Sequence, residues 1–256
     1  MFLGSVTAGL YSADRGLGHS RKILMETVRR ILLFLFLFYK AFGQQYSVSI
    51  WGFHAADVNL IGDSTSIDFQ TQNRGIFDMI WPTNNQYMTT FDQKDLSIQS
   101  WEKNIRQGSY KETLSGTVDP EGYITYSNND KIKIPNNTYT IFTLLEMVRT
   151  HDKEQLDTKW FDYEHEGSLG RARFIWADSS NKWNGEDSIL CDHYRFDIDI
   201  MDSTRYIKTN DHFMNNIIAT GTTRELWVTR SKTKKIMLAK VTVGPIPVWA
   251  RIQIDK

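Results

Sequence analysis

The densest group of titratable side chains in this sequence is Glu164-His165-Glu166, preceded by Asp162. Two carboxylates beside an imidazole can bind a metal or carry out general acid–base catalysis. On a β-strand, however, Glu164 and Glu166 would face one side of the sheet and His165 the other. Gly167 follows directly, which is typical of a solvated turn. We therefore favour an exposed turn and keep a hydrolase site around Asp162 to Glu166 as the alternative.

A second group, Cys191-Asp192-His193, could chelate a soft metal. Zinc sites need three or four ligands with characteristic spacing, and Cys191 is the only cysteine of the chain. In a strand that runs to Ile200, Cys191 would share a face with Arg195 rather than with Phe196. We predict a thiol on the wetter face or at the frayed start of the strand, without a metal-binding or catalytic role.

Sequence motifs for nucleophilic or phosphate chemistry are absent. Gly-x-Ser-x-Gly does not occur, and neither the P-loop pattern nor a Gly-x-Gly-x-x-Gly after a strand is found. We predict no catalytic residue, no cofactor and no metal, and hence a non-enzymatic protein.

The elements that carry these residues are mostly strands, because apolar residues recur with period two. Phe196, Ile198 and Ile200 alternate with charged residues, as one half-buried strand requires. Further predicted strands are 46–53, 66–71, 86–91, 98–105, 123–126, 171–177, 205–209, 226–230, 236–243 and 248–254, with turn chemistry between them, including 179–181. The fold class is mainly β: an antiparallel meander curled into an open barrel or a strongly bent sheet.

One segment has helical spacing instead. Ile141, Leu144, Leu145 and Val148 recur at intervals of three and four, which predicts a short helix around 140–149, capped by Thr138 or Thr140 and packed on the curved sheet. Its apolar face favours core packing, with Leu144 and Leu145 as a tentative ligand surface.

Trp249 completes that tentative ligand or partner surface. Its neighbours Val248 and Ala250 are expected to occupy the inward face of the last strand. Trp249 then points outward beside Arg251, where a protein partner or a lipid could cover it.

The N-terminal region predicts export. Ile31–Tyr39 is an apolar run that follows Arg29-Arg30, and it is too short to span a bilayer. Ala41 and Gly43 fit the small-residue rule for signal peptidase, so cleavage is predicted between Gly43 and Gln44. Residues 1–43 would be an upstream extension plus a signal peptide, with Met1 or Met25 as the start. Residues 44–256 would form a single all-β domain in the periplasm, or peripheral at the outer membrane, with no integral membrane span.

Charge argues against nucleic acid as a partner. Residues 1–43 hold six Lys and Arg and two Asp and Glu, which leaves 24 basic against 28 acidic side chains in residues 44–256. Binding to phosphates relies on an excess of Lys and Arg.

The order of the strands resembles a bacterial exported family, domain of unknown function 3108. The segment 46–58 (YSVSIWGFHAADV) is similar to its opening strand pair, 136–149 occupies the place of its helix, and 224–229 and 247–252 resemble its closing pair. Ala56 stands where that family usually has Gly. The resemblance implies an exported antiparallel β protein of the bacterial envelope and supplies no catalytic residue.

Three hypotheses remain open. The first is a non-enzymatic envelope protein whose curved sheet holds an apolar ligand, such as a lipid, or a partner segment. The second is a protein-interaction or structural module of the envelope. The third is the hydrolase near Asp162 and Glu166.

Overall fold

Fourteen antiparallel strands form one continuous sheet in the computed structural model, which describes residues 42–202, 207 and 209–253. All described elements belong to one compact unit, Ala41–Lys256. The strands are β1 (Phe42–Ile50), β2 (Phe53–Gly62), β3 (Ser66–Asn73), β4 (Asn84–Phe91), β5 (Ile98–Gln107), β6 (Tyr110–Val118), β7 (Tyr123–Tyr126), β8 (Lys131–Lys133), β9 (Trp160–His165), β10 (Ser168–Trp183), β11 (Ser188–Asp202), β12 (Thr223–Thr229), β13 (Ile236–Val243) and β14 (Ile246–Gln253).

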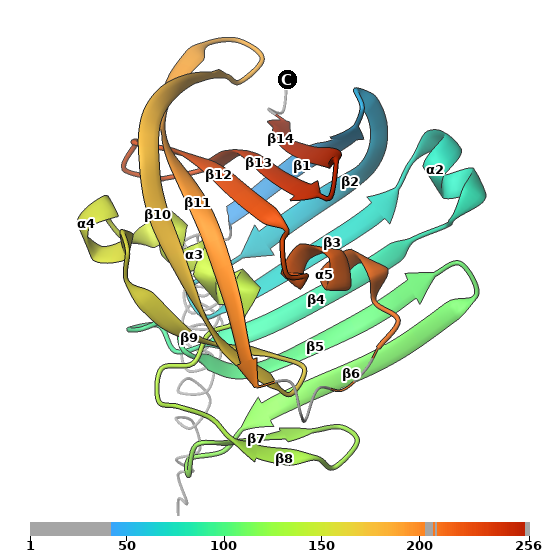
Figure 1. Cartoon of the computed structure of the whole chain (residues 1–256), viewed down its shortest axis with the longest axis vertical. Helices are drawn as coiled ribbons and strands as arrows, with labels where there is room; N and C mark the ends of the chain where they lie inside the picture. The colour runs from blue at the N-terminus through green and yellow to red at the C-terminus, as the bar shows by residue number, and fades with distance from the viewer. Residues whose placement is uncertain (1–41, 203–206, 208, 254–256) are drawn as a thin grey trace, which may run out of the picture. The chain divides into compact units, whose positions relative to one another are not determined.

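The sheet is curled but its ends are not joined as a ladder. The strand order is β8-β7-β6-β5-β4-β3-β2-β1-β14-β13-β12-β11-β10-β9, so β1 pairs with β14 and the two free edges are β8 and β9. Figure 1 shows the sheet bending around its helices. The predicted fold class, a mainly antiparallel open barrel or bent sheet, is confirmed.

Alternation along the strands decides which side chains line the concave face. In the β1–β14 pair, Tyr46 lies opposite Ile252, Val48 opposite Ala250, and Ile50 opposite Val248. Apolar residues on both strands therefore meet on one face, as a period of two requires. The turn between β1 and β2, Trp51-Gly52, has positive φ at both residues, which matches the right-handed twist of a two-residue hairpin.

The predicted helix is α3 (Ile141–Thr150). The hydroxyl of Thr140 accepts a hydrogen bond from the Thr143 amide, and Thr143 reciprocates to the Thr140 amide. This reciprocal cap begins the helix at Thr140, one of the two capping residues that the sequence predicted. Leu144 and Val148 are almost fully buried and fix α3 on the concave face of the sheet.

Three further helices were not predicted: α2 (Gly75–Ile80), α4 (Lys153–Leu156) and α5 (His212–Ile218). Each is shorter than two full turns, too short for a clear helical period. In α5 the carboxylate of Asp211 accepts from the Met214 amide at 3.1 Å. That cap was the one signal in the sequence that could have located α5.

Several predicted boundaries differ from the structure. β1 begins at Phe42 rather than Tyr46, and Phe42 and Gly43 already pair with Gly62 and Ile61 of β2. The predicted turn at 179–181 is wrong, because β10 continues through it to Trp183. The predicted strand 205–209 lies largely outside the described residues, and Ile207 and Thr209 are not in a strand. The proposed leader, up to residue 41, also lies outside the described residues.

Cys191 is buried, contrary to the predicted wetter face. On β11 the buried positions are Cys191, Tyr194 and Phe196, so the buried parity changes between Cys191 and Tyr194. The opposing strand β10 carries a bulge at this level, between Trp176 and Asp178. A bulge bends and twists the pair locally and redirects its side chains.

Candidate functional site

A cavity of about 630 Å3 lies on the concave side of the sheet. Its wall is formed by inward-facing residues of six consecutive strands of the sheet, β3-β2-β1-β14-β13-β12. They are mainly aliphatic: Val48, Ile50, Ala56, Val58, Leu60, Leu226, Ala239, Val241, Val248 and Ala250. The volume falls within the roughly 300–1,000 Å3 of typical ligand pockets, and the apolar walls favour an apolar occupant.

The helices α3 and α5 form the inner boundary of this cavity. Phe142 of α3 and Phe213 of α5 both line it and both pack on Phe69 of β3, with ring centroids 5.2 and 5.8 Å apart. Tyr87 of β4 touches the same two rings. This aromatic cluster fills the space beneath the helices and leaves the cavity open between them and β1–β2 and β13–β14.

The three tentative ligand residues divide between different environments. Leu145 lines the cavity. Leu144 does not, because its side chain has no exposed area and lies in the core beneath α3. Trp249 is also absent from the walls: its ring stacks on Trp227 at 6.1 Å, and Lys240 Nζ lies 5.2 Å from its centre.

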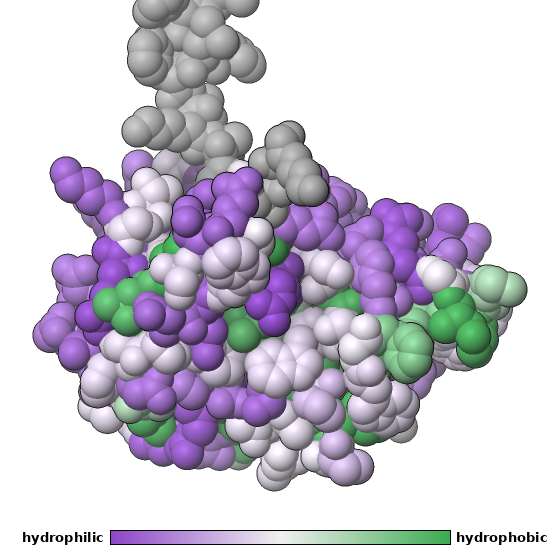
Figure 2. All heavy atoms as spheres, turned by 90° about the horizontal axis from the view of Figure 1, so that it is seen from above, coloured by the Kyte–Doolittle hydropathy of each residue, from purple (hydrophilic) through white to green (hydrophobic). Residues whose placement is uncertain are grey.

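Exposed apolar side chains border one end of the cavity. In α2, none of whose residues is buried, Ile76, Met79 and Ile80 are 63%, 85% and 73% exposed. Trp51 and Phe53 of the β1–β2 turn are similarly exposed. Figure 2 shows apolar residues gathered at the edge where Figure 1 places α2. Together, Trp51, Phe53, Ile76, Met79, Ile80 and Trp81 form the apolar rim, and Phe77 and Trp81 also line the cavity. Exposed apolar patches of this kind mark binding surfaces.

The two ends of the open sheet are joined by side chains. The β9–β10 turn, with positive φ at Glu166 and Gly167, brings this hairpin against β5 and β7 at the other end of the strand order. Glu164 accepts hydrogen bonds from Trp101 Nε1 at 3.0 Å, from the Tyr126 hydroxyl at 2.8 Å and from the Gly167 amide at 2.9 Å. We call this contact the seam.

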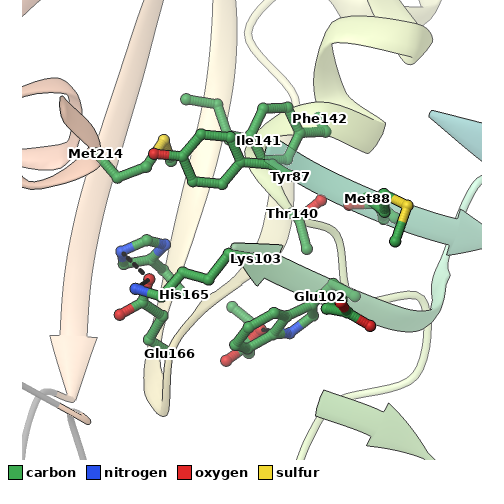
Figure 3. Close-up of a pocket in the computed structure, with 13 residues that line it drawn as sticks. Tyr87, Met88, Glu102, Lys103, Thr140, Ile141, Phe142, His165, Glu166 and Met214 are labelled. Atoms are coloured by element: carbon green, nitrogen blue, oxygen red, sulfur yellow. Dashed lines mark hydrogen bonds and ion pairs between the residues drawn. The ribbon is translucent and has the colours of Figure 1, made fainter. Parts of the chain in front are cut away.

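A buried ionic cluster continues the seam. Lys103 of β5, 2% exposed, donates to the Glu166 carboxylate and to the Thr209 hydroxyl, the latter at 2.8 Å. The Asp211 carboxylate lies 3.9 Å from Lys103 Nζ and accepts from the Tyr87 hydroxyl at 2.9 Å. Figure 3 shows Lys103, His165 and Glu166 converging from β5 and the β9–β10 turn.

Burial controls the ionisation of the seam. It raises the pKa of Glu164 to about 7, against the three donors that favour the carboxylate. It lowers the pKa of His165 to about 3, assisted by the nearby positive charge of Lys103. His165 is therefore neutral at physiological pH, and Glu164 titrates near neutrality.

The predicted solvated turn at Glu164 to Glu166 is therefore wrong: all three residues are buried, because their carboxylates find partners across the seam. The adjacent cavity measures about 30 Å3, a small space with room for a few water molecules. Across the ranges that the structure describes, no group of three or more His, Cys, Asp or Glu is placed to hold a metal ion.

Sequence reasoning missed two functional-site residues. Lys103 alternates with Trp101 and Ile105 on the inward face of β5, and its partners Glu166, in the β9–β10 turn, and Thr209, before α5, explain how a lysine can be buried there. Arg224, which lines the cavity, stands in a strand that was predicted only from Leu226 onward. The partners of Lys103 are distant in sequence, whereas Arg224 donates to carbonyls only two to seven residues away and shares the strand parity of Leu226, which indicates an inward position.

Comparison with known proteins supports the fold alone. No family model matches the chain, and no curated protein matches it. The structure is similar to a β-barrel-like protein of domain of unknown function DUF1849 from Brucella abortus, with a TM-score of 0.53 and 8% sequence identity, covering 84% of this chain and 97% of that one.

The resemblance to domain of unknown function 3108 is therefore wrong. The similar structure belongs to a different domain of unknown function, and no family model supports the first. The resemblance rested on strand order and spacing, which unrelated antiparallel meanders share. Among the described residues, none of the helices has the length and apolar character needed to cross a membrane.

Proposed function

We propose that this chain is a non-enzymatic protein of the bacterial envelope that holds an apolar ligand in the cavity lined by β1–β3 and β12–β14. The observation that carries the proposal is the cavity itself, about 630 Å3 with mainly aliphatic walls. This cavity is open to solvent, so its aliphatic walls are exposed to water. Covering apolar surface is favourable, so an apolar ligand of matching size should bind there.

The envelope location is part of the proposal and rests on the sequence of residues 25–43. Cleavage after Gly43 would remove Phe42 and Gly43 from β1, with their pairing to β2, and would leave the remaining contacts of β1 intact. The intact mass of protein recovered from the periplasm tests this. A mass that begins at Gln44 supports it, and one that still includes Ile31–Tyr39 refutes it.

Ligand binding is tested by calorimetry with hexadecanol and palmitic acid, using protein freed of bound lipid. Binding should show a negative heat-capacity change, the mark of apolar burial. Ala250→Phe places a ring in the cavity and should weaken binding. Gln253→Phe, at an exposed position on the same strand, is the matched control and should leave binding unchanged.

Adjacent leucines of α3 provide a second comparison. Leu145→Asp puts a carboxylate on the cavity wall and should lower affinity in a protein that still folds. Leu144→Asp buries that carboxylate in the core and should instead cost several kcal/mol of stability. If neither probe binds wild-type protein, the proposed function fails.

A protein-interaction module is the second candidate, favoured by the apolar rim. Its exposed residues would suit a partner with a complementary apolar surface. A stoichiometric protein partner in native mass spectrometry of material from the periplasm, with no bound lipid, would favour this candidate over the first.

A further inference from the structure

Arg224 is the one guanidinium among the residues that line the cavity. It lies on β12, two residues before Leu226, and therefore on the same inward face. Only 6% of the residue is exposed. A buried arginine is normally paired with a carboxylate or phosphate, because an isolated charge in an apolar environment is costly.

Its protein partners are carbonyl oxygens. The guanidinium donates to the carbonyl of Ile217, and to those of Ala219 and Thr222 at 3.0 Å each, around the C-terminal end of α5. These dipoles orient the side chain and offset part of its charge. They use three of its five N–H groups and leave donors for a further acceptor.

No carboxylate in the described part of the chain lies within ion-pair distance of Arg224. The acidic groups that act electrostatically on Arg224 are Tyr163 and Asp197, and Asp197 is itself bonded to Arg173 at 3.2 Å and Arg195 at 2.8 Å. Glu225, the next residue, is paired with Lys240 at 2.7 Å. Among the described residues, the carboxylates near Arg224 are thus already paired with other cations.

We propose that the cavity binds a single-chain fatty acid, with its hydrocarbon tail along the aliphatic walls and its carboxylate on Arg224. This inference rests on the proposed function and names its ligand class. A carboxylate matches the fork of N–H donors of Arg224, and its single negative charge neutralises the single positive charge of the guanidinium. A phosphate monoester carries between one and two negative charges at neutral pH, more than one guanidinium neutralises.

The experiment compares three probes with equal sixteen-carbon chains: palmitic acid, hexadecanol and hexadecyl phosphate, titrated by calorimetry at pH 8. Wild-type protein should bind palmitic acid about 10- to 100-fold more tightly than hexadecanol, the range expected for a hydrogen bond to a charged group. Arg224→Gln should abolish this preference while hexadecanol still binds. Arg230→Gln, an exposed arginine just after β12 that is paired with Asp192, is the matched control and should retain the preference.

Each alternative outcome is decisive. Equal affinity of wild-type protein for the acid and the alcohol would overturn the role of Arg224 and leave the apolar ligand proposal standing. Tighter binding of hexadecyl phosphate would overturn the choice of a carboxylate. If Arg224→Gln fails to fold because α5 loses its C-terminal contacts, the wild-type comparison still decides, and Arg224→Lys, which keeps the charge, should retain a reduced preference.

Discussion

Lys103→Met should destabilise the protein by about 3–5 kcal/mol, because it removes the cation from a buried ionic cluster and keeps the anions. Lys103 is 2% exposed, and its partner Glu166 is 3% exposed. Without the ammonium, Glu166 retains the Thr209 hydroxyl as its described neutral donor, at 3.0 Å. Asp211 also loses a positive charge 3.9 Å away, although it keeps the Tyr87 hydroxyl.

The measurements are urea unfolding and thermal unfolding at pH 7, both followed by circular dichroism. At about 2–4 °C per kcal/mol for a chain of this size, the melting temperature should fall by roughly 6–20 °C. The control is Lys131→Met, which breaks the exposed Lys131–Asp119 pair of 2.9 Å and should leave stability nearly unchanged.

A double substitution separates the pair from its surroundings. Adding Glu166→Gln to Lys103→Met removes the carboxylate that has lost its cation. The double variant should therefore lose at least about 1 kcal/mol less stability than the sum of the losses of the two single variants. If Lys103→Met costs no more than the exposed control, Lys103 is not part of a buried pair, and the account of the seam is refuted.

Three further predictions concern other regions. Glu164 has a pKa of about 7 in the fold against 4.5 in the unfolded chain, so its contribution to the free energy of unfolding rises by roughly 3 kcal/mol as pH falls from above 7 to below 4.5. Glu164→Gln should remove this rise, as measured by urea unfolding from pH 8 to 5. The variant should then show the opposite effect of His165, a loss of stability that begins below pH 6.5. Cys191→Ser should cost about 1–3 kcal/mol, because it buries a hydroxyl, and the wild-type thiol, with its pKa raised to about 11, should react slowly with a disulfide reagent until the protein unfolds. Met79→Ser with Ile80→Ser should change stability by less than about 1 kcal/mol, since both side chains are exposed, and an unfolding shift above that would mean that α2 packs against the sheet.

The fold class was predictable because it depends on local patterns. Val248 and Ala250 alternate with polar or bulky outward residues, and the same alternation in β1 marks that strand without knowledge of its partners. Two threonines, Thr138 and Thr140, placed the start of α3 to within one turn for the same reason: a cap acts within one turn of its helix.

The candidate site was not predictable to the same degree, because its contacts join distant parts of the chain. Glu164 meets Trp101 only because the sheet curls through more than half its strands before its ends approach. A charged triplet followed by glycine has the pattern of an exposed turn until that partner is in place. The face occupied by Cys191 was predicted wrongly because the opposing strand carries a bulge, which alternation along β11 alone cannot detect.

The seam and the cavity are connected through α5. Asp211 caps the N-terminus of α5 and lies in the ionic cluster with Lys103, while Phe213 and Ile217 of the same helix line the cavity. Arg224 holds the carbonyls at the other end of the helix. A ligand carboxylate on Arg224 would accept from the N–H groups that those carbonyls leave unused, and a change of charge in the cluster would alter the hydrogen bond by which Asp211 caps α5. A helix of seven residues has little stability of its own, so α5 depends on both contacts to hold its place as the inner boundary of the cavity.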